Sequence, residues 1–482
     1  MTGCRIPGRV MLAALLVTAP ARCGAEPASG PLRVSKANPR YFADATGRTV
    51  YLTGSHTWPN LIDRGPADPP AAFDYDAYLD LLKTHRHNFV RLWTRHVSKY
   101  VFYSGDNQPL YSQPLAWPRT GPGMALDGKP KFDLDRLDRA YFDRLRERVV
   151  AAGERGIYVA IMLFGGYSEC KEWQGSPFNA ANNVNGIDGD PDADGGGFET
   201  HNLELIPPAL FKVEEAYVRK VIDTVNDLDN VLYEISNESM QDSWKWQYHW
   251  IDYIRAYEGM KPKQHPVGMT AFFDVNDNPK LWASPADWIS PGPASPFWDD
   301  RREPYIVDPA EADGSKVVLL DSDHLFFRLM INEPALATAW AWKSFCRGHN
   351  PILMENLFVD SSGSRVPVTL DDPGFSAARR AMGHTAGYAS KIDLAAATPQ
   401  DGLSSTRYCL ASEGAQYLVY QPADGPFDVT LAAGTYVVEW FDPATGEATA
   451  GGTITAETGK RDFTPPFTGP AVLYLNGDPD QE

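Results

Sequence analysis

Residues 230–239 read Asn-Val-Leu-Tyr-Glu-Ile-Ser-Asn-Glu-Ser, an apolar run that ends in the pair Asn237-Glu238. A short apolar run bounded by polar residues predicts a buried strand, and this one places a carboxyl group where the strand ends. A structural alternative is that Asn237 or Ser239 caps the helix that follows. The pattern on either side of this stretch decides between the two interpretations.

Short apolar runs alternate with amphipathic stretches up to about residue 392. We expect eight strands, at residues 50–53, 89–93, 158–164, 231–235, 267–272, 288–289, 317–320 and 352–354. Helical segments are expected between them, at residues 75–83, 134–153, 208–227, 244–257, 333–347 and 375–391. This alternation predicts an α/β fold, a (β/α)₈ barrel over residues 26–392. The pair Asn237-Glu238 then stands at the mouth, after the fourth strand.

Three long loops, rich in Gly, Pro and Asp, follow predicted strands at residues 104–132, 165–202 and 291–313. They would lie at the barrel's carboxyl-terminal face, where active sites of this fold are built. Beyond residue 392 the runs become shorter and alternating, at 408–411, 416–421, 427–431, 435–441, 447–455 and 471–475. Turn signals separate them, so residues 393–482 are predicted to form a small antiparallel β-sandwich.

The N-terminus carries Arg5 and Arg9, then an apolar run from Val10 to Ala19, then small residues near Ala25. This order predicts a secretory signal peptide over residues 1–25, and a secreted or periplasmic protein. Its removal would leave three cysteines, Cys170, Cys346 and Cys409, and so at most one intramolecular disulfide.

The chain has a formal net charge of −18 and contains 13 Trp, 22 Tyr and 22 Phe. An acidic protein repels phosphate backbones and anionic headgroups, so neither nucleic acid nor a membrane surface is an expected partner. Abundant aromatic rings suit a neutral ligand, and we expect an oligosaccharide or polysaccharide. Nothing in the composition indicates an oligomeric state.

A fourth barrel strand that ends in Asn-Glu resembles the acid/base end of the retaining glycoside hydrolases of the large cellulase-like clan. The resemblance implies that Glu238 is the acid/base and that Asn237 binds a substrate hydroxyl. In that clan a second carboxylate follows the seventh strand, which here ends in Asp321-Ser322-Asp323-His324. We therefore expect Asp323 as the nucleophile, or as the base of an inverting enzyme, with Asp321 as its rival. The clan ordinarily has Glu there, so Asp is a departure.

The clan also has an arginine in the second strand, which implies that Arg91 holds the nucleophile ionised. Glu355, after the eighth strand, is a reserve acid. The other residues expected to bind substrate, by hydrogen bonds or by stacking on sugar C–H faces, are His56, His324, Trp58, Trp93 and Trp244.

A narrower resemblance rests on Asp321-Ser-Asp-His-Leu325 together with Trp342-Lys-Ser-Phe-Cys-Arg347-Gly-His-Asn350. These motifs resemble secreted cellulase-like barrel proteins labelled apiosidase-like or DUF4038-like. Such proteins frequently carry a C-terminal β-sandwich called a collagen-binding domain, and the tail here, with Trp440-Phe-Asp442-Pro-Ala-Thr-Gly446, is similar to it. The resemblance implies a glycoside hydrolase acting on plant or microbial polysaccharide, with a sandwich that packs on the barrel or binds sugar.

Two alternatives stay open. A non-catalytic carbohydrate-binding or matrix-binding protein on a degenerate barrel would explain the Asp in place of Glu. A metal-dependent hydrolase could use Asp321, Asp323, His324 and His56. The sequence has no Gly-rich phosphate loop, no H-E-x-x-H and no G-x-S-x-G motif, so no cofactor is expected and no metal is assigned to the site.

Residues 185–194 alternate carboxylates as a calcium loop does. The bidentate Glu that ends such a loop is missing from the expected position. We therefore interpret the segment as a solvated acidic loop.

Overall fold

The computed structural model describes residues 28–101, 109–166, 170–273, 277–292, 304–325, 333–355, 370 and 373–477. The predicted signal peptide lies outside these ranges, and the side chain of Cys170 is not among the described side chains. Cys346 and Cys409 are buried free thiols. None of the helices within the described ranges is both long enough and apolar enough to cross a membrane.

Eight parallel strands close into a barrel, so the predicted fold class is confirmed. The strands are β4 (Gly54–His56), β6 (Phe89–Leu92), β11 (Tyr158–Gly165), β12 (Val231–Asn237), β13 (Val267–Thr270), β14 (Trp288–Ser290), β15 (Val317–Asp321) and β16 (Asn350–Met354). They pair in chain order, and β16 returns to β4 to close the barrel. Nearly all of their residues are buried. Strands covered on both faces read as continuous apolar runs, which is why the sequence revealed them.

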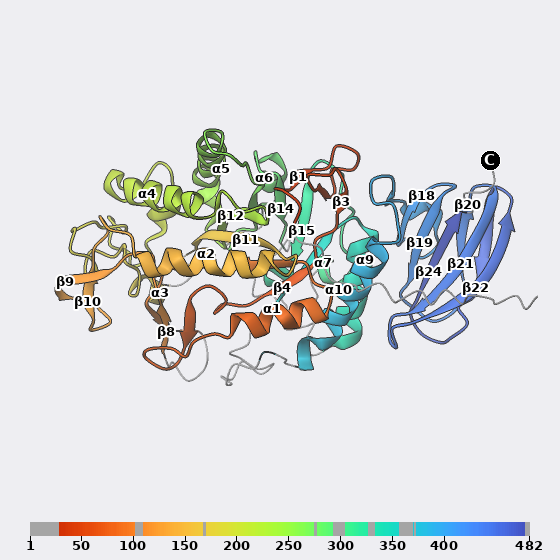
Figure 1. Cartoon of the computed structure of the whole chain (residues 1–482), viewed down its shortest axis with the longest axis horizontal. Helices are drawn as coiled ribbons and strands as arrows, with labels where there is room; N and C mark the ends of the chain where they lie inside the picture. The colour runs from red at the N-terminus through yellow and green to blue at the C-terminus, as the bar shows by residue number, and fades with distance from the viewer. Residues whose placement is uncertain are drawn as a thin grey trace, which may run out of the picture.

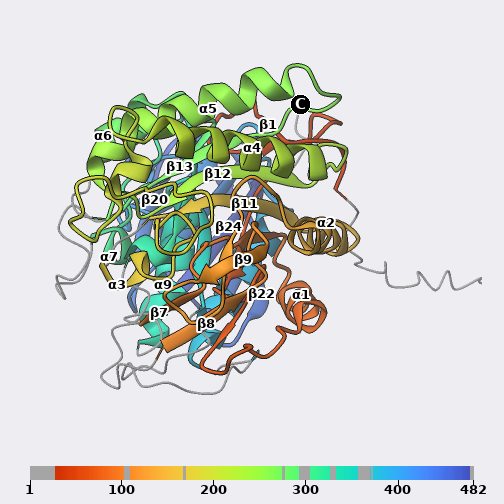
Figure 2. The same cartoon turned by 90° about the vertical axis from the view of Figure 1, so that its left-hand side faces the viewer.

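Helices cover the outside of the barrel. They are α1 (Tyr75–Thr84), α2 (Arg139–Gly153), α4 (Pro208–Val225), α5 (Trp244–Glu258), α6 (Asn278–Ala283), α9 (Pro334–Cys346) and α10 (Ser376–Ala389), with short helices α3 (Cys170–Trp173) and α7 (Pro304–Val307). Figure 2 shows α1, α2, α4 and α5 arranged around the barrel strands. Each of these four turns an apolar face inward; in α1 that face is Tyr78, Leu79 and Leu82, and Asp74 caps its first turn.

The first barrel strand begins later than predicted, at Gly54 instead of residue 50. Val50 belongs to a small antiparallel sheet of β1 (Arg33–Val34), β2 (Phe42–Ala43) and β3 (Thr49–Val50). Val50 and Leu52 join the core that fills the amino-terminal end of the barrel. Gly54 itself allows the barrel to close, because a Cβ there would lie 1.8 Å from the carbonyl oxygen of Phe89.

The loop predicted at residues 104–132 contains strands in its described part. β8 (Pro109–Gln113) pairs with β5 (Asp63–Gly65) and β7 (Lys99–Val101), and β9 (Arg119–Met124) pairs with β10 (Pro130–Phe132). The Gly/Pro/Asp-rich segment therefore contains strands as well as turns: Pro122 and Pro130 lie in the two-stranded β9–β10 sheet, where both strands are edges and a missing N–H costs little, and Pro109 is the first residue of β8.

The C-terminal part consists of two antiparallel sheets. The larger sheet has the order β17 (Thr398–Pro399), β18 (Cys409–Ser412), β19 (Gln416–Gln421), β24 (Ala471–Gly477), β21 (Gly434–Asp442) and β22 (Glu447–Ala456). The smaller pairs β20 (Phe427–Leu431) with β23 (Gly459–Phe463). Apolar side chains such as Tyr417, Val429 and Leu473 fill the space between the sheets.

The other face of the larger sheet packs on the barrel. Trp342 of α9 stacks on Tyr420 of β19 with ring centroids 6.2 Å apart, and it also contacts Phe441 of β21. Tyr388 of α10 donates a hydrogen bond to Glu439 of β21 at 2.6 Å. Barrel and sandwich therefore share one buried core, separate from the core inside each.

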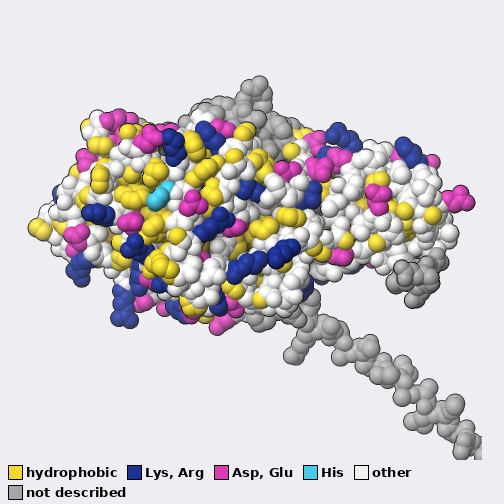
Figure 3. Space-filling view, turned by 90° about the horizontal axis from the view of Figure 1, so that it is seen from above, with side chains coloured by type: hydrophobic (Ala, Val, Ile, Leu, Met, Phe, Trp, Pro, Cys, Tyr) yellow, Lys and Arg dark blue, Asp and Glu magenta, His cyan; other side chains and the backbone are white. Residues whose placement is uncertain are grey.

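The sandwich and the barrel mouth lie at opposite ends of the long axis. In Figure 1 the sandwich occupies the right-hand end, while α3 and the β9–β10 hairpin, which follow the carboxyl ends of β11 and β6, occupy the left-hand end. Seen from above, basic and acidic side chains are interspersed over the surface (Figure 3).

Candidate active site

Five of the predicted site residues meet where barrel strands end. His56 ends β4, Arg91 lies on β6, Asn237 ends β12, Asp321 ends β15, and Asp323 lies in the 3₁₀ helix η3 (Ser322–Leu325) that follows β15. Parallel strands deliver all five to the carboxyl-terminal face of the barrel. All five side chains are buried.

Arg91 is the centre of this cluster. Its guanidinium donates to both carboxylate oxygens of Glu234, with Nε to Oε2 at 2.6 Å, and to Oδ1 of Asn237 at 2.7 Å. Its Nη1 lies 3.4 Å from Oδ2 of Asp323 and 3.5 Å from Oδ2 of Asp321. Burial lowers the pKa of Arg91, but these carboxylates outweigh it and the pKa is raised. Arg91 thus stays charged, and its shortest contacts are to Glu234, not to Asp323.

Glu234 was not predicted, although the sequence carried a signal for it. That signal is an acid within an otherwise apolar strand, because a buried carboxylate needs a partner of opposite charge. Glu234 is fully buried and forms the bidentate pair with Arg91. It anchors the arginine that reaches toward Asp323.

His56 connects Trp93 to Asp321. The indole N–H of Trp93 donates to Nδ1 of His56 at 2.8 Å, and Nε2 of His56 lies 2.9 Å from Oδ1 of Asp321. Because an indole nitrogen can only donate, Nδ1 must accept, so Nε2 carries the proton and donates it to Asp321. The same oxygen accepts the backbone N–H of Asp323 at 2.9 Å. Asp321 is therefore held by neighbours on both sides.

Asp323 is 6% exposed, and its pKa is raised to about 6. Burial is the main cause and the negative charge of Asp321 adds to it, while Arg91 and His56 oppose the shift. Asp323 thus ionises close to neutral pH, at a higher pH than an ordinary aspartate does.

Glu238 follows β12 in an unusual backbone conformation, with φ of 49° in the left-handed region. Residues other than glycine seldom adopt it, and such outliers gather at functional sites. Gly166, just after β11, makes room for this turn, since a Cβ there would lie 2.2 Å from the carbonyl oxygen of Glu238. The turn therefore depends on a glycine in a neighbouring loop.

The surroundings of the Glu238 carboxyl favour its protonated form. Its Oε1 is buried and has no hydrogen-bond partner among the described residues. Burial raises the pKa of Glu238 well above its usual range, the charge of Asp323 raises it further, and Arg95 and Arg91 oppose this. A carboxyl that stays protonated beside one that ionises near pH 6 can act as a general acid opposite an anionic nucleophile or base.

Arg95 and Glu172 form a second unpredicted pair beside Glu238. Arg95 donates to Glu172, which is buried in helix α3, and both charges act on the pKa of Glu238. The sequence places Arg95 two residues after Trp93, but its partner comes from a distant loop.

The aromatic predictions have mixed outcomes. Trp58 and Trp93 pack edge to face, 6.2 Å between centroids, with Met162 and Met354 beside them. Trp93 also lies under the guanidinium of Arg91 at 4.5 Å. Trp244 instead begins α5 and packs on Tyr248, near the ammonium groups of Lys245 and Lys280. Among the described contacts, none brings Trp244 to the carboxyl cluster. The side chain of His324 lies outside the described residues.

Glu355, the reserve acid, is fully buried and paired with Arg379 of α10 through two hydrogen bonds of 2.7 and 3.0 Å. This pair ties β16 to a helix on the outside of the barrel. It gives Glu355 a structural role.

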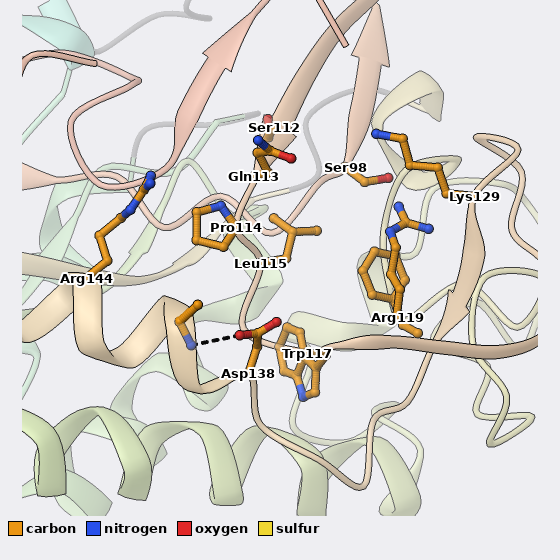
Figure 4. Close-up of a pocket in the computed structure, with 12 residues that line it drawn as sticks. Ser98, Ser112, Gln113, Pro114, Leu115, Trp117, Arg119, Lys129, Asp138 and Arg144 are labelled. Atoms are coloured by element: carbon orange, nitrogen blue, oxygen red, sulfur yellow. Dashed lines mark hydrogen bonds between the residues drawn. The ribbon is translucent and has the colours of Figure 1, made fainter. Parts of the chain in front are cut away.

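A hollow of about 430 Å³ lies apart from this cluster, between β8 and the start of α2. Figure 4 shows its lining, with Trp117, Arg119 and Arg144 around it. Its acid, Asp138, accepts the backbone N–H of Ala140 and so caps α2. This hollow holds no pair of carboxyls comparable to Glu238 and Asp323.

Two family models match parts of the chain. A domain of unknown function, DUF6298, matches residues 103–282, which include β11, β12 and Glu238. A model described as "Putative collagen-binding domain of a collagenase" matches residues 398–472 in the sandwich. No curated protein matches the sequence.

Solved structures share the architecture over nearly the whole chain. One titled "Glycoside hydrolase" superposes with a TM-score of 0.59 at 13% identity, covering 94% of this chain and 98% of its own. A glycoside hydrolase family 5 protein from Bacteroides vulgatus superposes with a TM-score of 0.60 at 14% identity, covering 93% of each chain. The protein therefore has the fold of these glycoside hydrolases, the sheet domain included.

Proposed function

We propose that this protein is a secreted glycoside hydrolase that cleaves O-glycosidic bonds in plant or microbial polysaccharide. One observation carries the proposal: two carboxyls, Glu238 after β12 and Asp323 after β15, interact at the barrel mouth with pKa values displaced from the ordinary range. The fold shared with solved glycoside hydrolases supports a carbohydrate substrate.

The roles follow from the two environments. Protonated Glu238 donates its proton to the glycosidic oxygen as the bond to the leaving group breaks. Ionised Asp323 attacks the anomeric carbon and forms a glycosyl ester, and Glu238, now a carboxylate, then takes a proton from the water that hydrolyses it. Glu238 is then protonated again, and Asp323 is again a free carboxylate.

The neighbours of Asp323 serve this cycle. Arg91 lies 3.4 Å from Asp323 and favours its anionic form. Asp321, anchored by His56, accepts the backbone N–H of Asp323 and fixes the start of η3. Asn237, whose Oδ1 accepts from Arg91, is proposed to direct its amide N–H toward a substrate hydroxyl. Trp58 and Trp93 are the proposed stacking surface.

The test is a screen of plant and microbial polysaccharides for released sugar, followed by variants. Glu238→Gln and Asp323→Asn should each lower kcat by about 10²-fold or more while the protein stays folded. The exposed Glu204→Gln and Asp135→Asn are matched controls and should keep full activity. A fully active Glu238→Gln enzyme would refute the assignment. NMR of the first-formed anomer then distinguishes retention from inversion.

The family match at residues 398–472 favours a second candidate, a non-catalytic carbohydrate-binding or matrix-binding protein. Against it, one face of the larger sheet is buried on α9 and α10, which supports a packing role for the sandwich. Pull-down with collagen fibrils and with insoluble polysaccharides separates the two. Binding to collagen with no sugar released from any polysaccharide would favour this candidate.

The secreted location is a proposal that rests on residues 1–25. Expression of the full chain in a secretion-competent bacterium should yield a protein outside the cytoplasm whose N-terminus starts near Glu26. A cytoplasmic product that still carries Met1 would contradict it.

A further inference from the structure

The acidic segment at the carboxyl-terminal side of β11 has a feature that the proposed reaction does not use. Counted from Asp188, acids stand at the first, third, fifth and seventh positions, and Glu199 is the twelfth residue. This spacing is that of a calcium-binding loop, D-x-D-x-D-G-x₅-E, with Ala193 in the place of the glycine. The prediction that the terminal glutamate of such a loop is missing was therefore wrong, since Glu199 stands at that position.

The chain folds so that three of the five spaced acids converge. Asp190, Asp192 and Glu199 each offer a carboxylate oxygen, and these oxygens all lie within 4.8 Å of one another. Ala193 has φ of 61°, so it takes the left-handed turn that the glycine provides in such loops. The backbone N–H of Gly195 holds the other oxygen of Asp190 at 3.0 Å.

Two of these acids are buried, and each has one carboxylate oxygen without a hydrogen-bond partner among the described residues. Asp190 is 7% exposed and Glu199 8% exposed. Oδ1 of Asp190 and Oε2 of Glu199 are inaccessible and have no hydrogen-bond partner in the described part of the chain. An unpaired buried carboxylate oxygen is costly, and the natural compensation is a proton or a cation.

No arginine or lysine of the described residues forms an ion pair with Asp190, Asp192 or Glu199. Burial raises the pKa values of Asp190 and Glu199, and Asp192 and Asp194 raise them further. The cluster therefore gathers negative charge that the protein itself leaves uncompensated. A cation between the three carboxylates would turn this repulsion into attraction.

We propose that Asp190, Asp192 and Glu199 bind a calcium ion. The cluster offers only carboxylate oxygens, which are hard ligands suited to calcium, and it lacks the His and Cys ligands that zinc prefers. The loop belongs to a protein proposed to be secreted, where calcium is abundant and loops of moderate affinity suffice.

The ion would hold a wall of the barrel mouth in place. Glu199 lies in the 3₁₀ helix η1 (Phe198–His201), and Nδ1 of His201 lies 3.1 Å from Oγ of Ser239, the neighbour of Glu238. Both ends of the loop rest on Trp173, since a Cβ at Gly189 or Gly197 would come within 2.7 Å of its ring. Calcium thus would fasten the segment that packs behind Glu238.

The test uses the full chain after treatment with EDTA and desalting. Calcium chloride should raise its thermal unfolding temperature by several degrees in a saturable manner, and magnesium chloride should do so much less. Terbium should show luminescence when tryptophan is excited, because Trp173 lies against the loop, and calcium should quench this luminescence by competition. Asp192→Asn and Glu199→Gln should weaken calcium binding by about tenfold or more, since affinity follows the number of charged ligands.

Glu204→Gln is the matched control: it makes the same change in an exposed glutamate just beyond the loop, paired with Lys245, and should bind calcium as the wild type does. Asp192 is exposed, so its variant folds even if Glu199→Gln does not. The proposal is overturned if calcium changes neither the unfolding temperature nor terbium luminescence, if magnesium acts equally, or if Asp192→Asn binds calcium as tightly as the wild type.

Discussion

Trp93 donates its indole N–H to Nδ1 of His56 at 2.8 Å, and by doing so it determines which nitrogen of His56 bears the proton. The remaining N–H of His56 is directed at Asp321, which in turn accepts the backbone N–H of Asp323. A residue predicted as a stacking surface for sugar therefore also orients the acid beside the proposed nucleophile. The contacts run from β6 through β4 to β15.

The Trp93→Phe variant tests this chain of contacts. Phenylalanine keeps an aromatic ring but removes the donor, so His56 is free to take either tautomer. We expect kcat to fall by about tenfold, the equivalent of one lost hydrogen bond, with the pH dependence of kcat altered. Trp244→Phe makes the same change at a tryptophan that packs on Tyr248 away from the cluster, and it is the control. An unchanged pH profile in Trp93→Phe would contradict the orienting role.

The pKa values predict the pH dependence of catalysis. Asp323 must be ionised, so kcat/KM should rise as pH increases through about 6. Glu238 must be protonated, and kcat/KM should fall at the higher pH where it ionises. Because Asp321 raises the pKa of Asp323, Asp321→Asn should move the acidic limb to lower pH. An acidic limb that stays in place would show that another group controls it.

Stability should respond in the opposite sense to activity. The pKa of Asp323 is raised from 3.8 to about 6 on folding, so its contribution to stability is present below about pH 4 and is lost as pH rises through 6. Asparagine does not ionise, so Asp323→Asn does not lose this stability as pH rises. Thermal unfolding should place the variant higher relative to wild type at pH 8 than at pH 4. A difference that is equal at the two pH values would refute the shift.

Glu234→Gln should destabilise the protein strongly. It leaves the buried guanidinium of Arg91 without its bidentate partner, a loss of about 3 kcal/mol in the free energy of unfolding. Urea unfolding measures this value. Glu204→Gln, which breaks an exposed pair with Lys245, is the control and should cost little. Equal effects of the two substitutions would contradict the role of Glu234 as the anchor of Arg91.

Gly166→Ala should displace Glu238. The added Cβ would meet the Glu238 carbonyl oxygen at 2.2 Å, and backbone on both sides must shift. We expect a loss of about 1–3 kcal/mol of stability, as for other overpacked sites, and a larger proportional loss of activity. Gly402→Ala is the matched control, since nothing lies within 4 Å of a Cβ there. Wild-type activity in Gly166→Ala would show that the turn at Glu238 tolerates movement.

Much of the fold could be predicted because barrel strands are buried on both faces and leave continuous apolar runs. The misplacement of the first strand has the same cause: Val50 and Leu52 are as apolar as a barrel strand, but they close the barrel's end. β23 was missed because its residues, Gly459–Phe463, are mostly polar and pair in a two-stranded sheet at the surface. The local sequence pattern does not distinguish a barrel strand from a segment that closes the barrel's end, or a polar surface strand from a loop. Tertiary packing determines which of them forms.

The candidate site could be predicted where a polar or charged residue lies in a barrel strand near its carboxyl end or directly after it. The strand count together with the resemblance to the cellulase-like clan predicted Asn237, Asp321, Asp323 and Arg91, and the structure brings these four residues together. Glu234 was missed because an acid inside an apolar strand has meaning only once its partner Arg91 is seen across β11. Trp244 shows the reverse error, because nearness to a strand end in sequence did not place it in the cluster.

The core shared by Trp342, Tyr420 and Phe441 makes the sandwich a rigid extension of the barrel instead of a tethered module. The mouth and the sandwich point in opposite directions along the molecule (Figure 1). If the sandwich adhered to a solid surface, the mouth would face outward into solution. Such an enzyme would act on dissolved polysaccharide chains that diffuse to the mouth. It would not reach the surface to which the sandwich adheres.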